Sequence, residues 1–300
     1  MRTTSDVLTA LGLPARDAYD LPTSRKRFPD GGQYRVEIPS VEGPKAMEGV
    51  LSAAGEHGVG IHRVSQGSGI LLQTDDETRR MLALGHDAHV EVCLFVGPRA
   101  AWDTGIQASS TLGRVVGSSL RGADQLAYGI EDVRHGCALG LRSILVSDLG
   151  QLVVLGRMKK DGDLPPDLVL KISVTLAAAN PATARLLEDL GATSINLPVD
   201  LSLPQIAAIR QATDAAIDLY VEAPDDIGGV VRHYEIPELV RIAAPIYLKF
   251  GVRNHGGLYP SGQHLEGLVV ALARERVRRA AIGLAVLKRY APDAVASPRA

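Results

Sequence analysis

Residues 168–200 read LVLKISVTLAAANPATARLLEDLGATSINLPVD and describe a strand, a helix and a second strand. Asn180 before Pro181 is a typical helix start, because the asparagine side chain caps the first turn and proline is tolerated at the first helical position. Gly191 ends the helix, since glycine readily adopts the left-handed conformation found there. Two strands joined by a helix are usually parallel, so this stretch predicts a β/α fold.

The same alternation continues along most of the chain. Strand-like segments lie near 34–39, 60–65, 88–96, 142–147, 168–173, 192–197, 216–222 and 245–250, and helix-like segments near 44–57, 75–85, 122–139, 150–160, 180–190, 203–213, 235–243 and 263–289. Eight such units make up a TIM-type (β/α)8 barrel, which is the fold class we predict. An open doubly wound sheet is the alternative, but no G-x-G-x-x-G follows a strand and no Walker A sequence is present.

The predicted barrel occupies residues 34–290. Residues 1–33 form a short N-terminal extension with a brief helix around Leu8 and Leu11, and residues 291–300 form a C-terminal tail. Segment 98–121 is rich in Gly, Ser and Thr and contains the single tryptophan. We expect it to be a long loop after the third strand, where such loops often cover a substrate.

Composition narrows the classes of partner. The chain has 300 residues, of which 46% are hydrophobic and 22% charged, and its formal net charge is -2. This is an ordinary globular composition with no sign of a nucleic-acid partner. No run reaches 18 apolar residues, so no membrane span is expected and a cytoplasmic location is the default. Cys93 and Cys137 are too few for a disulfide framework and fit thiols in a reducing compartment.

Several predicted strands end on a charged or amide residue. In a β/α barrel, polar residues at the carboxyl ends of the strands build the active site. Here they alternate with large aliphatic residues, which predicts that they face the barrel interior. Such a ring fits either an active site or a structural ion-pair network. Its members are Glu37, Glu91, Lys171, Asn196, Glu222 and Lys249.

We predict acid–base or electrostatic catalysis on a small anionic substrate at this mouth. The predicted catalytic residues are Glu37, Glu91, Lys171, Glu222 and Lys249. The predicted substrate-binding residues are Arg63, Asn196, Arg253, Asn254 and Tyr259. Two Gly-rich loops, 224–229 and 251–257, fit either a phosphate site or tight turns.

The residues leave three alternatives open. A desolvated Lys171 or Lys249 would form a Schiff base with a carbonyl substrate, as in barrel aldolases and related lyases. A divalent metal is the second alternative, although no ligands stand at a tight spacing. Its candidate ligands are Glu37, His62, Glu91, Asp148 and Glu222. The third alternative is a non-catalytic barrel that binds a ligand or a partner protein.

From residue 168 to about 270 the sequence resembles the collagenase-like peptidases of peptidase family U32. The motifs that carry the resemblance are Ile172-Ser173-Val174, Asn180, Leu190-Gly191-Ala192, Ile195–Pro198, Leu201–Ile206 (LSLPQI), Leu219–Glu222 (LYVE) and, more loosely, Leu248–Arg253 with Tyr259. The resemblance implies a β/α barrel and a hydrolase-type enzyme. It draws attention to Glu222, Lys249 and Arg253 in particular.

The chain departs from that family at its cysteines. Family members carry several cysteines after the strand that corresponds to 219–222, whereas residues 223–229 here read APDDIGG. Some members bind a cysteine-ligated iron–sulfur cluster, which Cys93 and Cys137 alone do not suffice to hold. We therefore expect no such cluster, and the cofactor is otherwise unknown. The expected partner is a small-molecule substrate, with a homodimer and a hetero-complex as alternative assemblies.

Overall fold

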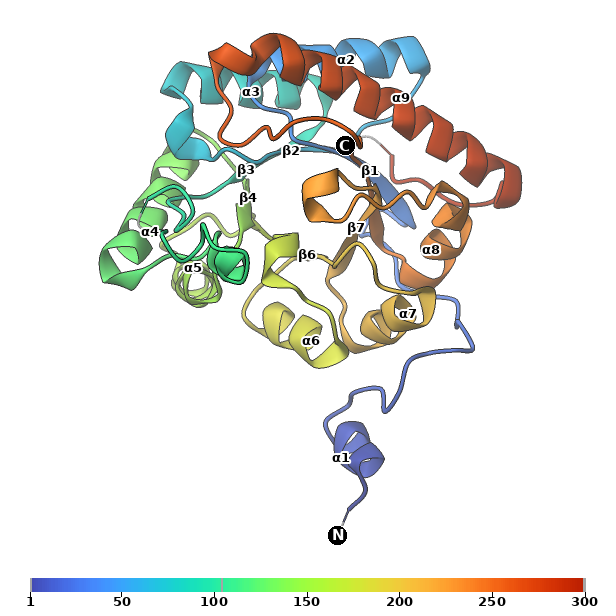
Figure 1. Cartoon of the computed structure of the whole chain (residues 1–300). Coiled ribbons are helices and arrows are strands. Elements are labelled where there is room, and N and C mark those ends of the chain that lie inside the picture. Colours follow the sequence, from blue (N-terminus) through green and yellow to red (C-terminus); the bar gives the residue numbers. More distant parts are fainter. Residues whose placement is uncertain (1, 104, 299–300) are drawn as a thin grey trace.

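The computed structural model describes residues 2–103 and 105–298. Within these residues, parallel strands in sequential order close into a barrel with helices around it (Figure 1). The strands are β1 Tyr34–Pro39, β2 Arg63–Gln66, β3 Glu91–Phe95, β4 Ser143–Val146, β5 Val169–Ile172, β6 Ser194–Asn196, β7 Ala216–Glu222 and β8 Ile246–Phe250. The predicted TIM-type (β/α)8 barrel is confirmed.

One helix follows each strand, and a further short helix precedes the barrel. The helices are α1 Thr4–Ala10, α2 Pro44–His57, α3 Asp75–Ala88, α4 Gly122–Ala138, α5 Leu149–Asp161, α6 Pro181–Asp189, α7 Leu203–Ala212, α8 Ile236–Ala243 and α9 Glu266–Tyr290. None of these helices combines the length and the apolar composition that crossing a membrane requires.

The helix signals read from the sequence act as predicted in α6. Asn180 accepts a hydrogen bond from the Thr183 backbone N–H at 2.9 Å, and Pro181 is the first helical residue. Gly191 follows the helix with φ +105°, which only glycine adopts without strain.

β2 and β3 begin three residues later than predicted. Ile61 and Val90 are buried in the core, but they lie before the strands that pair.

The apolar core lies between the strands and the helices. The outward-facing strand residues are aliphatic and fully buried, as Val36 and Ile38 of β1 illustrate. Two helices approach their neighbours closely at glycine: a Cβ on Gly156 of α5 would lie 2.2 Å from the Leu190 backbone oxygen, and one on Gly283 of α9 would lie 2.5 Å from the Phe250 ring. The strand residues that alternate with these aliphatic ones point into the barrel interior, and most of them are polar.

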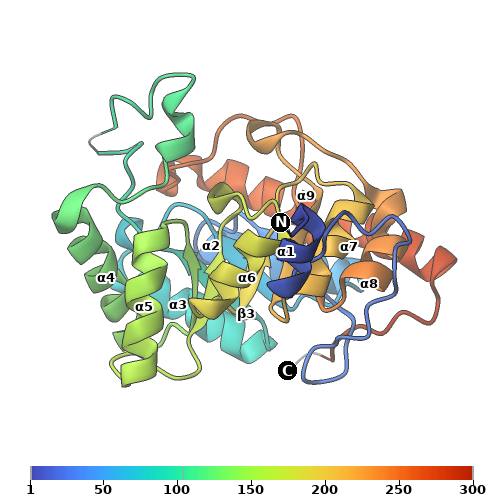
Figure 2. The same ribbon diagram turned by 90° about the horizontal axis from the view of Figure 1, so that it is seen from below.

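The two ends of the barrel are built differently. Figure 2 shows the loop between β3 and α4 and the loops after β7 and β8 rising on one side, while residues 24–33 and the C-terminal residues lie on the other. The predicted long loop after the third strand is thus present, and its described part contains only the short 3-10 helix Gly113–Val116. At the opposite end, Ala296 forms a bridge to Tyr34. α1 stands apart from the barrel and buries none of its residues (Figure 1).

A candidate active site at the barrel mouth

A cavity of about 180 Å³ opens at the carboxyl ends of the strands. Its walls come from strand ends on both sides of the barrel and from the loop between β3 and α4. Among the residues that line it are Ser65, Arg99, Asn196, Tyr220, Lys249 and Tyr259. Three of these, Asn196, Lys249 and Tyr259, are predicted site residues that the fold brings together.

Lys249 of β8 is the predicted catalytic residue that reaches this cavity. Its Nζ lies 4.2 Å from the centre of the Tyr220 ring and 3.4 Å from Glu37 Oε1. With the Asn196 amide oriented so that its oxygen faces the lysine, that oxygen accepts a hydrogen bond from Nζ at 2.9 Å. The ammonium group is thus held in place by a carboxylate, an amide and an aromatic face.

Glu37 of β1 is paired in register with Lys249 of β8 and is fully buried. Its carboxylate forms an ion pair and hydrogen bond with Lys171 of β5, and Ser65 donates to it at 2.7 Å. Arg63 Nη1 is 3.4 Å from Oε2. Burial alone would raise the pKa of Glu37, but Lys171, Lys249 and Arg63 hold it well below its ordinary value. Glu37 is therefore an anion that organises the surrounding cations.

Asp218 of β7 is a second fully buried carboxylate, and the sequence analysis did not single it out. Its side chain accepts from Ser194 at 3.1 Å and lies 3.3 Å from Arg63 Nη1 and 3.5 Å from Lys171 Nζ. Asp218 and Tyr220 occupy the interior parity of the strand AIDLYVE, which is the signal that could have identified it. Asp218 lies inside its strand and not at the carboxyl end, where an active-site residue of a barrel is expected.

Glu91 and Arg63 lie at the N-terminal end of the barrel, opposite the mouth. This corrects the prediction that they help to form the mouth. Arg63 Nε donates to Glu91 Oε1 at 2.8 Å, and its guanidinium lies 3.6 Å from the centre of the Tyr247 ring. Both residues line a cavity of about 410 Å³ at the N-terminal end, beside Phe28. The reason is position: each is the first residue of its strand, far from the carboxyl end.

The structure also corrects the prediction that Glu222 faces the barrel interior. The register between β7 and β8 shifts between Tyr220 and Glu222, so that Glu222 no longer shares the inward direction of Tyr220. Its carboxylate accepts from the Arg253 backbone N–H at 3.2 Å and lies 3.5 Å from His233 Nε2 and 3.8 Å from Arg279 Nε of α9. Burial opposes ionisation, yet these partners lower the pKa of Glu222. It therefore belongs to the helix layer.

The loop after β8 carries the remaining predicted binding residues, two of which lie on the rim and one at the cavity. Arg253 donates to Asp225 from Nη2 at 2.7 Å and from Nε at 2.9 Å, and the Asn254 backbone N–H donates to the other oxygen of the same carboxylate. This pair ties two loops together on the exposed rim. Tyr259 instead bends back to the cavity, where its hydroxyl shares a hydrogen bond with Ser40. Its ring packs so closely on Gly67 that a Cβ there would lie 2.3 Å from Cε1.

Arg99, in the loop between β3 and α4, is a cavity residue that the sequence analysis missed. Its guanidinium lies 3.6 Å from the centre of the Phe95 ring and 3.8 Å from that of Trp102. Nη2 donates to the Gly67 backbone oxygen. Burial lowers the pKa of Arg99 to about 10, so it stays cationic at neutral pH. The signal in the sequence was an arginine directly after the apolar strand and its Gly-Pro pair.

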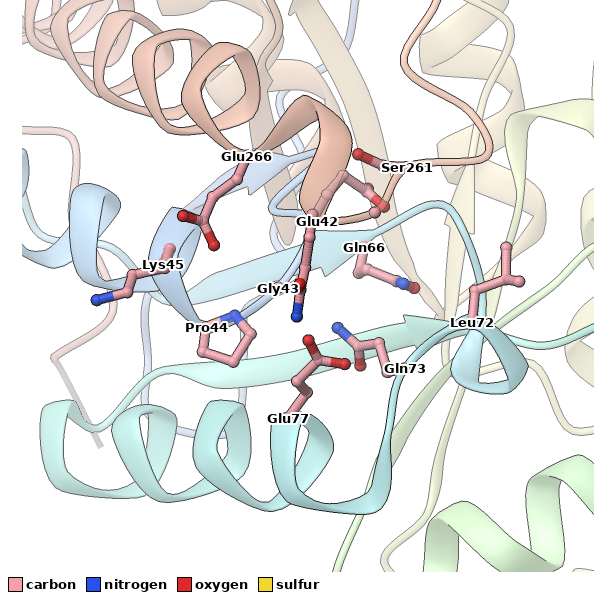
Figure 3. A pocket seen from close by; sticks show the side chains of 12 residues that line it. Glu42, Gly43, Pro44, Lys45, Gln66, Leu72, Gln73, Glu77, Ser261 and Glu266 are labelled. Atoms are coloured by element: carbon pink, nitrogen blue, oxygen red, sulfur yellow. The ribbon is translucent and has the colours of Figure 1, made fainter.

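A smaller pocket of about 40 Å³ lies outside the barrel wall, beside the mouth. Figure 3 shows Glu42, in the loop after β1, and Gln66, at the end of β2, near Glu77 of α3 and Glu266 of α9. Glu42 accepts from the backbone N–H groups of Gly67 at 2.7 Å and Ser68 at 3.1 Å. Its pKa is nevertheless raised by burial. We infer that Glu42, which lines this pocket, holds the loop at Gly67 that frames the mouth.

The candidate metal ligands do not converge. Across residues 2–103 and 105–298, no group of three or more His, Cys, Asp or Glu side chains is arranged to hold a metal ion. His62 accepts from the Val36 backbone N–H at 3.0 Å and faces the Ser297 oxygen at 2.9 Å. Asp148 caps α5 through the Gln151 N–H at 2.9 Å.

A profile of peptidase family U32 matches residues 120–223. The resemblance inferred from the sequence is confirmed for this part of the chain. The profile and the predicted stretch share residues 168–223, while residues 224–270 lie outside the profile match. No curated protein matches the sequence.

Solved structures of other barrels align with most of the chain. A U32 peptidase is 14% identical with a TM-score of 0.44, covering 77% of this chain and 97% of that chain. A Rubisco-like protein from Rhodopseudomonas palustris is 12% identical with a TM-score of 0.50, covering 97% of this chain and 73% of that chain. Thiamine phosphate pyrophosphorylase from Pyrococcus furiosus is 12% identical with a TM-score of 0.47, covering 85% and 98%. At these identities the likeness concerns the fold alone.

The U32 match covers only one side of the site. It includes Lys171, Asn196, Asp218 and Tyr220, which lie on β5, β6 and β7. Lys249 on β8 and Arg99 in the loop after β3 lie outside it. The two cations that line the mouth cavity therefore come from parts of the chain that the family profile does not match.

Proposed function

We propose that the protein is a U32-like barrel enzyme that acts on a small anionic substrate in the mouth cavity, with Lys249 as the catalytic cation. The observation that carries the proposal is the position of Lys249, which is held at the cavity by Asn196, Tyr220 and Glu37. A fixed cation in a water-poor site is suited to stabilise negative charge that develops in a transition state.

The buried network supports this role by fixing the lysine in advance. Within the described residues, Glu37, Asp218 and Glu91 face Lys171, Lys249 and Arg63, so the formal charges balance. Moving Lys249 away would cost Glu37 one of its cationic partners, so the network holds the lysine in place. A preorganised charge does not need to reorient when the substrate reacts, which is the main source of electrostatic catalysis.

The proposal is tested by comparing Lys249→Met with Arg157→Met, which removes an exposed ion pair on α5 and serves as the matched control. Each protein is assayed on a panel of short peptides, small carboxylates and phosphate esters, and folding is checked by circular dichroism. We expect Lys249→Met to lower kcat at least about 100-fold, a typical loss for one oxyanion-stabilising group. The control should retain wild-type turnover. Full turnover by Lys249→Met would contradict the proposal.

A lyase that uses a Schiff base is the second candidate, because Lys249 rather than Lys171 lines the cavity. In that reaction the neutral lysine amine attacks a substrate carbonyl, water leaves, and the iminium formed draws electrons from the bond that breaks. Treatment with pyruvate and sodium borohydride should then add one reduced adduct to Lys249, located by peptide mass spectrometry. Lys249→Arg should give no adduct. An unmodified wild-type protein would argue against this candidate and leave the electrostatic one standing.

A further inference from the structure

We propose that Arg99 is the residue that recognises the anionic group of the substrate, and that this group is a carboxylate or a phosphate. The inference rests on the proposed function, because it assigns a substrate class to the same cavity. It also replaces Arg253, whose guanidinium is engaged by Asp225 on the rim. Arg99 is the better candidate because it lines the cavity itself.

Arg99 is a buried cation that makes no salt bridge within the described part of the chain. It is 8% exposed, and within residues 2–103 and 105–298 the two carboxylates that act on its charge, Glu42 and Asp132, form no ion pair with it. Its Nε has no hydrogen-bond partner among the residues that the structure describes. A buried charge is costly unless it is paired, and leaving a guanidinium N–H without an acceptor adds to that cost. A bound oxyanion would supply both a negative charge in direct contact with the guanidinium and the missing acceptor.

The surroundings of Arg99 determine how a ligand would meet it. Phe95 and Trp102 contact the guanidinium at 3.6 and 3.8 Å from their ring centres. Aromatic contacts of this kind engage the planar faces of the group and leave its N–H edge for hydrogen bonds. Nη2 already donates to the Gly67 oxygen, which holds the group against the mouth. The N–H fork of arginine matches the spacing of two oxygens in a carboxylate or a phosphate.

The loop that carries Arg99 is anchored at both ends and open at its tip. The Gly97 N–H donates to Asp132 at 3.1 Å, and the Leu120 N–H donates to Asp148 at 3.1 Å. Between these anchors, Ile106 and Leu112 are almost fully exposed. An anion that bridges Arg99 to the strand ends would therefore add a further tether at the base of the loop, close to the Gly97 anchor.

Trp102 is the single tryptophan of the chain and stacks on Arg99, so its fluorescence reports on this site directly. Inorganic phosphate and acetate are titrated separately into the full-length protein, with chloride at matched ionic strength as the reference. The wild type should show a saturable change in Trp102 emission with at least one of the two ions, and chloride should not reproduce it. Which ion binds more tightly distinguishes a phosphate site from a carboxylate site.

The variants Arg99→Lys and Arg99→Met decide the assignment. We expect Arg99→Lys to weaken binding at least tenfold, because lysine keeps the charge but loses the fork, and Arg99→Met to abolish it. Isothermal titration calorimetry measures the same affinities without using Trp102, whose emission changes when Arg99 is removed. Arg157→Met should bind as the wild type does. Equal affinity in Arg99→Met and the wild type, or no saturable binding in the wild type, would overturn the inference.

The two proposals fail in different ways. If Arg99→Met leaves KM unchanged while Lys249→Met abolishes turnover, the proposed function stands and the recognition role of Arg99 is wrong. If anion binding depends on Arg99 while Lys249→Met retains full turnover, Arg99 is a binding residue and the catalytic role of Lys249 is wrong.

Discussion

At the scale of single residues, Glu37 shows how a carboxylate stays ionised inside a barrel. It is fully buried, and its pKa is held low by Lys171, Lys249 and Arg63. Desolvation of the charges offsets much of their attraction, so the network is a weak argument for stability as a whole. Removing one member is different, because it leaves the others buried without compensation.

Glu37→Gln should therefore be strongly destabilising. We expect a loss of about 3–5 kcal/mol in the free energy of unfolding at pH 7, measured by urea denaturation. The folded-state pKa of Glu37 lies below its ordinary value of 4.5, so its contribution is present above that pH and is lost as the pH falls. The difference between wild type and variant should shrink below about pH 4.5.

Glu48→Gln is the matched control for that experiment. Glu48 pairs with Lys45 and Arg80 on the surface, where its side chain is 33% exposed. Exposed pairs contribute about 0–1 kcal/mol. A loss in Glu37→Gln no larger than in Glu48→Gln would show that the interior network does not depend on its carboxylate.

Asp132 is expected to have the opposite pH dependence. Burial raises its pKa from 3.8 to about 6, so the folded state holds the proton longer than the unfolded state. Stability should therefore fall as the pH rises from about 4 to 6, and the cost is fully present above 6. Asp132→Asn keeps an acceptor for Gly97 and should be more stable than wild type by on the order of 1 kcal/mol at pH 7.5. Urea denaturation at pH 4.5 and 7.5 tests this, and a larger advantage at pH 4.5 would contradict the assignment.

At the scale of secondary-structure elements, a close approach between a helix and neighbouring backbone fixes how the helix layer packs. α5 passes so close to the end of α6 that a Cβ at Gly156 would lie 2.2 Å from the Leu190 oxygen. The opposing atom belongs to the backbone and cannot turn aside. The irregularity in β7 is the other feature at this scale, because it redirects Glu222 from the interior to the helix layer.

Gly156→Ala and Gly55→Ala should change stability in opposite directions. We expect Gly156→Ala to cost about 1–3 kcal/mol, since the added methyl group overpacks a rigid contact. Gly55 lies in α2, where a Cβ would point into open space, so alanine there should stabilise by about 0.5–1 kcal/mol through its higher helix propensity. Thermal unfolding of both variants measures the difference, and destabilisation of equal size would refute the packing argument.

At the scale of the whole molecule, the N-terminal extension closes the end of the barrel opposite the mouth. Phe28 is 7% exposed, its ring centre is 5.2 Å from that of Tyr247, and Arg35 lies 4.2 Å from its ring centre. The Ser24 backbone N–H donates to the Arg241 oxygen at 2.8 Å, which ties this segment to α8. The segment therefore covers the Arg63–Glu91 end of the interior network.

Phe28→Ala should weaken this closure. We expect a loss of about 3 kcal/mol in the free energy of unfolding, as for other buried phenylalanines. Leu11→Ala, at an exposed site after α1, should stay within about 0.5 kcal/mol of the wild type. Equal effects of the two substitutions in urea denaturation would indicate that residues around Phe28 are not part of the folded barrel.

The sequence by itself determined the β/α alternation, the number of barrel units, the long loop after the third strand and the resemblance to peptidase family U32. These depend on local signals such as Asn180-Pro181 and Gly191, which act within one or two turns of chain. It also identified Lys249, Asn196 and Tyr259 as residues of the mouth, because each lies at or beyond a strand end.

Only the tertiary structure decided which polar residues meet. Glu91 and Glu222 resemble Glu37 in sequence, but one begins its strand and the other follows a register shift, and neither position can be read from alternation alone. Arg99 joins the site because a loop folds back against Gly67. Side-chain direction follows from local periodicity, whereas height in the barrel and the return of a loop depend on pairing with strands distant in the chain.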